Sequence, residues 1–345
     1  MKTYILLFFL ACQSLAVLAQ DDEKTPYLTK SLSSDAISSL VVTTSAGGIL
    51  VSGESGQQPR IDVYIRGNND RELSKDEIRK RLDDNFDMSI TVNNHELQAI
   101  VKTKHNNIDW NKEGLNISFK IYVPQGVSTD LHTSGGGIHL DNLSGNEKFS
   151  TSGGGLDLDK LNGTVRGNTS GGGIHIENSG NDIDLHTSGG GIIATNCTGT
   201  IKLETSGGGL ELENLKGTIN AHTSGGGVRA NNIEGELVTS TSGGGIDLKD
   251  MKCSLSASTS AGSLNAQIKQ VGKYLMLRTS AGDINVELPA NQGLDLNLNA
   301  ERIDEHQFPK FNGDWDSRHI KGTINGGGAT VDASANSGSL NVHFN

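Results

Sequence analysis

Hydrophobic and polar positions follow one another from residue 133 to about residue 264 in a pattern that repeats every 18 residues. Every repeat opens with Thr-Ser, and we count its positions from that threonine. The pair returns at constant spacing, at Thr133, Thr151, Thr169, Thr187, Thr205, Thr223, Thr241 and Thr259. Self-similarity at a fixed period is the signature of a repeat array in which each repeat forms one structural unit.

Apolar side chains occupy the same five places in nearly every repeat. Positions 6 and 8 are aliphatic, as at Ile138 and Leu140, and position 11 adds a third apolar residue, such as Leu143. Positions 15 and 17 add a further pair, such as Ile183 and Leu185. Side chains two apart in a strand share a face, so each repeat is expected to form a coil of two short strands around a thin core. One coil cannot offset an ordering entropy of about 1–2 kcal/mol per residue, so the coils must stack. The prediction is an all-β fold, a single β-solenoid of about 18-residue coils.

Glycine and asparagine mark the predicted corners of each coil. Positions 3 to 5 are Gly-Gly-Gly in every repeat but the last, which reads Thr-Ser-Ala-Gly, and position 13 is usually glycine. Glycine adopts positive φ without a steric penalty, so we expect positive φ at these corners. Position 10 is mostly asparagine, which tolerates the left-handed conformation. A column of asparagines is therefore expected along one turn.

Residues 40–132 depart from the period and are expected to close the N-terminal end of the array. Apolar residues alternate or cluster there in segments that predict strands, at residues 40–51, 61–65, 88–92, 97–101 and 115–123. Ser74 and Glu77 have the spacing of a capping box at the start of a helix. Ile78, Leu82 and Phe86 follow at four-residue steps and give that helix one apolar stripe, with which it would cover the end of the core.

The regular solenoid is expected to span residues 133–300, and residues 301–345 to close the C-terminal end. Residues 301–320 read as an irregular insertion that contains Phe308, Phe311 and Trp315. These aromatic residues are expected to pack on the last coil. Residues 322–328 and 337–342 are expected to form two closing strand-corner-strand units.

The first 20 residues have the pattern of a signal peptide. An apolar run from Tyr4 to Ala11, too short to span a bilayer, is followed by the small-residue cleavage pattern Val17-Leu18-Ala19. Residues 21–39 are polar and serine-rich and are expected to form a leader with little structure. No later segment approaches the length of a transmembrane span. Export to the periplasm or cell surface is the prediction.

The net charge argues against one class of partner, and the spacing of the cysteines argues against a disulfide. The formal net charge of −11 repels phosphate backbones and argues against a nucleic-acid partner. Cys197 and Cys253 lie three repeats apart, which at about 4.8 Å per strand is roughly 14 Å. A disulfide needs Cα atoms within about 7 Å, so two free thiols in the core are predicted.

Histidine and acidic side chains gather at the outward positions 7 and 9 of the first three repeats. The six residues are His139, Asp157 and His175 in one column, with Asp141, Asp159 and Glu177 beside it. On adjacent strands about 4.8 Å apart they could hold a divalent cation. The alternative is a solvated acidic face with His–Asp pairs across strands, each worth about 0.2–1 kcal/mol. We favour the second interpretation because a flat sheet face offers a metal little second shell. No metal ligand, cofactor or catalytic residue is predicted.

An enzyme acting on polysaccharides is the nearest catalytic alternative for a β-helix. Glycosidases need two carboxylates at a defined separation within a cleft. The acids of this chain instead stand in regular columns, without a break in the repeat that would build a cleft. A non-enzyme is therefore predicted.

Three features together resemble a known family. They are the serial Thr-Ser-Gly-Gly-Gly coils, the strand Ile121-Tyr122-Val123-Pro124 that leads into them, and the closing Gly-Thr-Ile-Asn-Gly-Gly-Gly at 322–328. The combination is similar to the bacterial putative-adhesin β-solenoid family, which is related to auto-transporter adhesin head domains, and it covers residues 40–345. The resemblance implies an exported β-helical protein and brings no catalytic residues with it.

The predicted function is that of an exported, monomeric, non-catalytic protein. It would serve as an adhesin or cell-envelope scaffold that binds an envelope or extracellular partner, a glycan or a protein, through its outward polar faces. The alternative is a carbohydrate-active or cation-binding β-helix protein that uses the outward face of coils 133–186.

Overall fold

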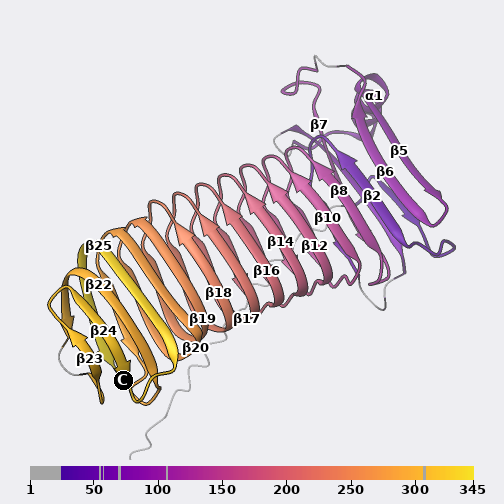
Figure 1. Cartoon of the computed structure of the whole chain (residues 1–345). Helices are drawn as coiled ribbons and strands as arrows, with labels where there is room; N and C mark the ends of the chain where they lie inside the picture. Colours follow the sequence, from indigo (N-terminus) through magenta and orange to yellow (C-terminus); the bar gives the residue numbers. More distant parts are fainter. Residues whose placement is uncertain (1–24, 54–55, 57, 69–70, 106–107, 306–307) are drawn as a thin grey trace, which may run out of the picture.

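The computed structural model describes residues 25–53, 56, 58–68, 71–105, 108–305 and 308–345, and these form one elongated stack of β-coils (Figure 1). The signal peptide predicted for residues 1–20 lies outside the described residues. Most strands pair in parallel with the strand one coil away, and the chain has one helix in this part. The predicted all-β solenoid is confirmed.

The elements follow the chain in three groups. The N-terminal group is β1 (Leu28–Ser31), β2 (Ser39–Thr44), β3 (Ile49–Ser52), β4 (Arg60–Gly67), α1 (Lys75–Asn85), β5 (Phe86–Asn93), β6 (Glu96–Thr103) and β7 (Leu115–Tyr122). The array is β8 (Ser128–Thr133), β9 (Ile138–Asp141), β10 (Asn146–Thr151), β11 (Leu156–Asp159), β12 (Asn162–Thr169), β13 (Ile174–Glu177), β14 (Gly180–Thr187), β15 (Ile192–Thr195), β16 (Thr198–Thr205), β17 (Leu210–Thr223), β18 (Val228–Thr241), β19 (Ile246–Ala261), β20 (Leu264–Ala281) and β21 (Ile284–Leu288). The C-terminal group is β22 (Leu294–Glu305), β23 (Asn312–Trp315), β24 (His319–Ile324) and β25 (Ala329–Phe344).

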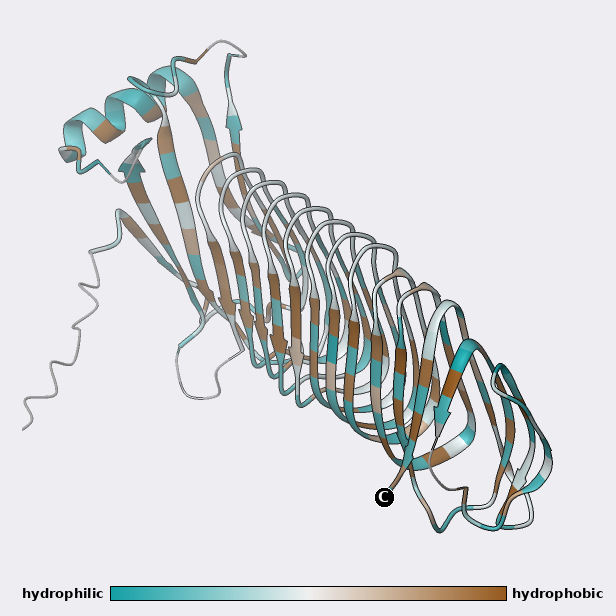
Figure 2. Cartoon of the chain, turned by 90° about the vertical axis from the view of Figure 1, so that its left-hand side faces the viewer, coloured by the Kyte–Doolittle hydropathy of each residue, from teal (hydrophilic) through white to brown (hydrophobic). Residues whose placement is uncertain are grey.

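The coils stack in a register of 18 residues, as the period predicts. Thr151 of β10 lies beside Thr169 of β12, and Leu156 of β11 lies beside Ile174 of β13. Positions 6 and 8 point inward from one face, and positions 15 and 17 point inward from the other. Hydrophobic and hydrophilic residues therefore alternate along the strands of the array (Figure 2). The core is a thin apolar layer that runs the length of the molecule.

The threonine at position 1 is buried and joins neighbouring coils. Thr151 Oγ1 donates to the carbonyl oxygen of Gly136 in the preceding coil at 2.7 Å and accepts from the amide of Gly154 in its own coil at 3.3 Å. Equivalent donor bonds of 2.6–2.9 Å recur at every threonine of the array. A hydroxyl that satisfies two buried backbone groups explains why the position is threonine and not valine.

The glycines of the Thr-Ser-Gly-Gly-Gly corner are required for a different reason from the one predicted. At position 13, Gly199, Gly217 and Gly235 have positive φ, as predicted. At positions 3 to 5 of the array's Thr-Ser-Gly-Gly-Gly copies, no glycine has positive φ. A Cβ on Gly154, at position 4, would lie 2.0 Å from the carbonyl oxygen of Gly136. A Cβ on Gly153, at position 3, would meet nothing closer than 3.5 Å. Close approach between successive coils therefore excludes a side chain at position 4.

At both ends of the stack, the order of the strands in space differs from their order in the sequence. The first coil, β2 and β3, lies between β8 and β9 on one side and β6 and β7 on the other. The last coil, β25, lies between β20 and β21 on one side and β22 on the other. Each terminal coil is therefore enclosed by a segment that folds back over it, and the predicted N-terminal cap, residues 40–132, contains one complete coil of the solenoid.

The predicted helix is confirmed, but only the Ser74 half of its predicted capping box is present. Ser74 is the N-cap of α1 and its hydroxyl accepts from the amide of Glu77 at 3.2 Å, while the Glu77 carboxylate pairs with Arg81 at 2.7 Å. Ile78 and Leu82 are buried. Phe86, expected as the third member of the apolar stripe, is also buried but lies just past the helix, as the first residue of β5. The helix lies at the N-terminal end of the stack, where it contacts β4, β5 and β7 (Figure 1).

Three expectations about the ends were wrong. Within the described part of the expected polar leader, Leu28–Ser31 forms β1, which pairs antiparallel with β4, and Leu32 is buried. The expected irregular insertion at 301–320 contains the end of β22, all of β23 and the start of β24, and β24 runs antiparallel to β22. Residues 322–328 therefore form a turn out of that antiparallel strand and not a solenoid coil.

Aromatic residues close the C-terminal end, as expected. Phe308 lies 5.2 Å from Phe311, 5.2 Å from Trp315 and 5.7 Å from Phe344 of β25, measured between ring centroids. Trp315 remains 56% exposed.

Cys197 and Cys253 are free and buried, as predicted. Among the described residues, no helix is long and apolar enough to cross a membrane.

Candidate functional site

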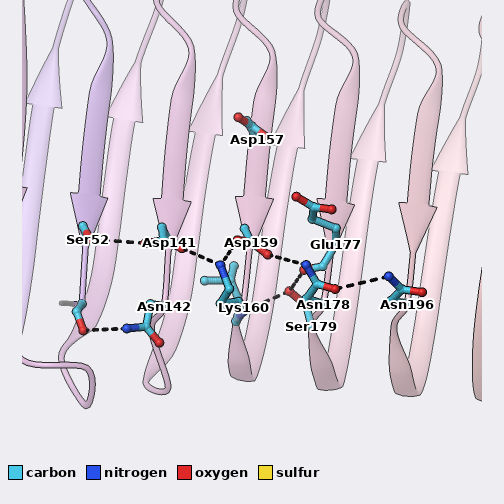
Figure 3. Close-up of polar contacts among 12 residues, drawn as sticks. Ser52, Asp141, Asn142, Asp157, Asp159, Lys160, Glu177, Asn178, Ser179 and Asn196 are labelled. Atoms are coloured by element: carbon cyan, nitrogen blue, oxygen red, sulfur yellow. Dashed lines mark hydrogen bonds and ion pairs between the residues drawn. The ribbon is translucent and has the colours of Figure 1, made fainter. Parts of the chain in front are cut away.

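The structure brings together the six outward residues that the sequence places on the first three coils. His139 of β9, Asp157 of β11 and His175 of β13 are direct partners across neighbouring strands. Asp141, Asp159 and Glu177 form the second column in the same register, next to the corner at which each of these strands ends (Figure 3). The predicted stacking order is therefore present.

The two imidazoles engage the carboxylate between them. His139 Nδ1 lies 2.9 Å from Asp157 Oδ2, and His175 Nδ1 lies 3.5 Å from Asp157 Oδ1. All three side chains remain substantially exposed. Both oxygens of Asp157 therefore have an imidazole neighbour, and the arrangement is a cross-strand His–Asp–His row of the kind that the solvated-face interpretation describes.

Lys160 supplies the positive charge for the second column. Its Nζ lies 3.7 Å from Asp141 Oδ1 and also contacts Asp159 Oδ2. Burial raises the pKa of Asp159, but the hydrogen bonds from Lys160 and Asn178 outweigh burial and hold the pKa below its usual range. The hydrogen bond to Asp159 in turn raises the pKa of Lys160. Ammonium and carboxylates thus form a charged row across two coils (Figure 3).

Sequence reasoning missed Lys160, although a signal was present. Lysine stands at position 10, which is asparagine in most coils, and it follows directly after Asp159. Its ammonium group occupies the place beside the carboxylates that a divalent cation would need. Within the described residues there is no group of three or more His, Cys, Asp or Glu side chains that could hold a metal ion.

The asparagines of position 10 form the predicted column and are linked to one another. They adopt the left-handed conformation, with φ of 57° at Asn142, 50° at Asn178 and 54° at Asn196. Asn196 Nδ2 donates to Asn178 Oδ1 at 3.3 Å, and Asn178 Nδ2 donates to Asp159 Oδ1 at 2.9 Å. The ladder continues through Asn214 and Asn232 at 3.1 and 2.8 Å.

A polar groove follows this column along the axis of the solenoid. Its volume is about 400 Å³. Position 10 forms one wall, position 12 forms the other wall and position 11 forms the floor. The first wall is Asn142, Lys160, Asn178 and Asn196, and the second wall is Ser144, Asn162, Gly180 and Thr198. The floor is Leu143, Leu161 and Ser179, and Gln125 lies at one end. Amide and hydroxyl groups therefore line the groove at intervals of one coil.

A second groove lies along later coils, beside the Thr-Ser-Gly-Gly-Gly corners. Its volume is about 560 Å³, and glycines of position 5 form one side. The other side carries the position-7 residues Ile193, Glu211, Arg229 and Asp247. Ile193 is 43% exposed. This groove mixes an apolar side chain with both signs of charge, and it lacks the uniform lining of the first.

The fold and the groove define a class: a non-globular β-solenoid whose outward positions offer long, shallow polar surfaces. Comparison with known proteins then identifies the family. Residues 37–343 match the family model described as Toastrack DUF4097. The chain belongs to this family, in agreement with the resemblance seen in the sequence.

Two solved structures are also similar along most of the chain. One is of a putative cell adhesion protein from Clostridium sporogenes, 10% identical, with 92% of this chain and 98% of that chain covered and a TM-score of 0.20. The other is of a putative adhesin from Bacteroides fragilis, 12% identical, with 92% and 96% covered and a TM-score of 0.29. No curated protein matches the chain. Because these TM-scores are low, the identification rests on the family model.

Proposed function

We propose that this protein is an exported, non-catalytic binding protein, an adhesin or cell-envelope scaffold, and that its ligand lies along the groove beside the asparagine column. The observation that carries the proposal is the groove itself, which offers amide and hydroxyl groups at one-coil intervals over four coils. The strands are about 4.8 Å apart, so a ligand with a repeating structure meets the same chemistry at each step.

The lining favours a linear glycan over a peptide. A peptide strand binds by adding to an open sheet edge, but the strands beside this groove are paired in the ladder on both sides. The leucines of the floor are fully buried and provide no apolar pockets. Side-chain amides both donate and accept hydrogen bonds, which suits a chain of hydroxyl groups.

The groove is close to electrically neutral. Lys160 is its one charged residue, and that charge is shared with Asp141 and Asp159. Association with the ligand should therefore depend little on ionic strength, because exposed charges are what salt screens. A neutral polysaccharide fits these properties better than an anionic one.

Cation binding at the outward face of coils 133–186 has less support. Asp157 already faces His139 and His175, and Lys160 already neutralises the carboxylates beside it. Calorimetric titration of Ca²⁺ and Zn²⁺ into the wild-type protein and the His175→Ala variant separates the two functions. Heat in the wild type that disappears in the variant would favour the cation-binding alternative.

An array of linear and branched glycans, probed with the purified protein and followed for released products, tests the proposal. Binding of a linear neutral glycan without product release is expected. Release of shortened products would replace the proposal with the enzyme alternative. Failure to bind any glycan would rule out a glycan as the ligand. Fractionation of cells, with the mature N-terminus read by mass spectrometry, tests export.

The chain offers a matched pair of variants for the binding site. Asn196 lines the groove, whereas Asn232 lies in the same column outside it, and both have φ of 54°. Asn→Asp at either position keeps the size of the side chain, tolerates the left-handed conformation and removes two N–H donors. Asn196→Asp should weaken glycan binding about tenfold, roughly 1.4 kcal/mol, and Asn232→Asp should leave it unchanged. Equal effects of the two variants would place the ligand elsewhere.

A further inference from the structure

One inward position of the solenoid breaks the apolar pattern with an ionisable group. Position 15 is aliphatic in the coils that follow, with Val165 and Ile183 as its next members, but in the first coil of the array it is Glu147. Its side chain points into the core from β10 and is 2% exposed. None of the functions considered above uses this carboxyl group.

Glu147 has two hydrogen-bond donors and, within the described ranges, no ionic partner. Thr129 Oγ1, from the neighbouring strand β8, donates to Oε2 at 2.6 Å, and the amide of Gly145 donates to Oε1 at 3.1 Å. The buried acidic residues in the described part of the chain are Glu147 and Asp62, and Asp62 pairs with Arg60 at 2.9 Å. Glu147 is therefore the buried acid whose charge would be uncompensated.

Apart from the Thr129 hydroxyl, the buried side chains packed beside Glu147 are apolar. In register beside it lie Thr129 of β8 and Val165 of β12. Across the core, β9 and β11 present buried aliphatic side chains. The other titratable residues of β8, β10 and β12 alternate onto the opposite, outward face. They are Asp130, His132, Lys148 and Arg166, and their side chains are 41%, 43%, 70% and 47% exposed.

We propose that Glu147 is a pH-sensitive joint between the N-terminal end of the solenoid and its regular array: the neutral carboxyl holds β8 and β10 together, and its ionisation loosens this boundary. A neutral carboxyl can both donate to and accept from the Thr129 hydroxyl. An ionised one can only accept, and its charge lies in a medium that solvates it poorly.

The sign of the effect follows from the shift in pKa. Burial raises the pKa of Glu147 from 4.5 to about 7, and the bonds from Thr129 and Gly145 offset only part of that rise. The folded state therefore binds the proton more tightly than the unfolded state. Stability from this group is complete below pH 4.5, the unfolded value, and is lost as the pH rises toward and through about 7.

The geometry of a solenoid confines the effect to one place. Each coil contacts only its neighbours, so stability is close to a sum of local interfaces. The folded and unfolded pKa values lie about 2.5 units apart, so complete ionisation changes the local opening equilibrium by at most about 300-fold. The opening should appear at residues 128–151 and not in the later coils.

Native-state hydrogen exchange of the full chain at pH 5.5 and pH 8.5, corrected for the chemical exchange rate and read by mass spectrometry, tests the joint. Protection of residues 128–151 should fall by about 30-fold between the two pH values, because one of the roughly 2.5 pH units over which stability is lost lies below pH 5.5, while protection of residues 200–260 stays level. In Glu147→Gln, which keeps the side-chain size and cannot ionise, residues 128–151 should keep the same protection at both pH values.

Glu211→Gln is the matched control, because Glu211 is an exposed residue of β17. It should reproduce the wild-type pH dependence. Thr129→Val is a second variant, which removes the stronger donor to the carboxylate. At pH 8.5, residues 128–151 of this variant should be less protected than those of the wild type. Equal pH dependence in the wild type and Glu147→Gln, or protection of residues 128–151 that does not change with pH in the wild type, would overturn the proposal.

Discussion

The two corners of each coil differ in what lines them: backbone atoms in close contact at one, and outward side chains at the other. At the Thr-Ser-Gly-Gly-Gly corner, successive coils approach so closely that the backbone excludes a Cβ at position 4, and a buried threonine ties the coils together. At the asparagine corner, side chains point outward, their identity varies and a polar groove runs between them. A corner held by backbone contact fixes shape, whereas a corner lined by side chains is free to recognise a ligand.

The largest expected loss of stability comes from a substitution in the Thr-Ser-Gly-Gly-Gly corner. Gly154→Ala places a Cβ 2.0 Å from the Gly136 carbonyl oxygen, and the rigid backbone cannot move aside without separating the coils. We expect a loss of about 3 kcal/mol or more in the free energy of unfolding, measured by denaturant titration.

Gly153→Ala is the control for that substitution. The space at Gly153 extends to 3.5 Å, and Ala261 occupies the same position naturally in the last repeat. A change within about 0.5 kcal/mol is expected. Equal losses in the two variants would mean that conformation and not close approach requires the glycines.

A smaller effect is expected from the threonine ladder. Thr187→Val keeps the shape of a fully buried side chain but leaves the Gly172 carbonyl and the Gly190 amide without the hydroxyl. The expected loss is about 1–3 kcal/mol, measured by thermal or denaturant unfolding. Ser188→Ala, at the exposed neighbour, should change stability by less than about 0.5 kcal/mol; a Thr187→Val variant as stable as the wild type would show that the ladder does not stabilise the stack.

The smallest effect is expected at the asparagine corner. Lys160→Asn restores asparagine to its column and removes the ammonium group from Asp141 and Asp159. Exposed ion pairs contribute about 0–1 kcal/mol, so stability at pH 7 should fall by no more than that. The pKa of Asp159, followed by NMR, should rise because the hydrogen bond that lowers it is lost.

The pH dependence sharpens the Lys160→Asn comparison. Asp159 has a lowered pKa in the folded state, so its contribution is present above the unfolded value of 3.8 and is lost as the pH falls through the folded value. The stability difference between wild type and variant should therefore shrink in acid. A difference that persists at low pH would show that Lys160 acts through packing and not through charge.

The sequence was sufficient to predict the solenoid, because each coil repeats the same physical solution. The columns at Ile138 and Leu140, the inward threonines and the left-handed asparagines all follow from periodicity and local preference. The reason for the position-4 glycines could not be predicted, because it depends on the distance between coils. The return of β6 and β22 over the terminal coils could not be predicted either, because those pairings are long-range and unperiodic.

The candidate site was predictable only where it follows the period. The column order of His139, Asp157 and His175 was correct, since register alone fixes it. Lys160 and Glu147 were missed because each departs from the residue type that fills most of its column. Reading each column for the residue that departs from its chemistry would have found both, and such exceptions are where a repeat protein acquires individual properties.

The most direct test of the division between the two corners is a titration of the glycan identified on the array into Thr187→Val and Asn196→Asp, at a temperature at which both are folded. We expect Thr187→Val, although less stable, to bind with the affinity of the wild type. We expect Asn196→Asp, although as stable as the Asn232→Asp control, to bind about tenfold more weakly. Weaker binding by Thr187→Val together with unchanged binding by Asn196→Asp would contradict this division, because recognition would then belong to the Thr-Ser-Gly-Gly-Gly corner.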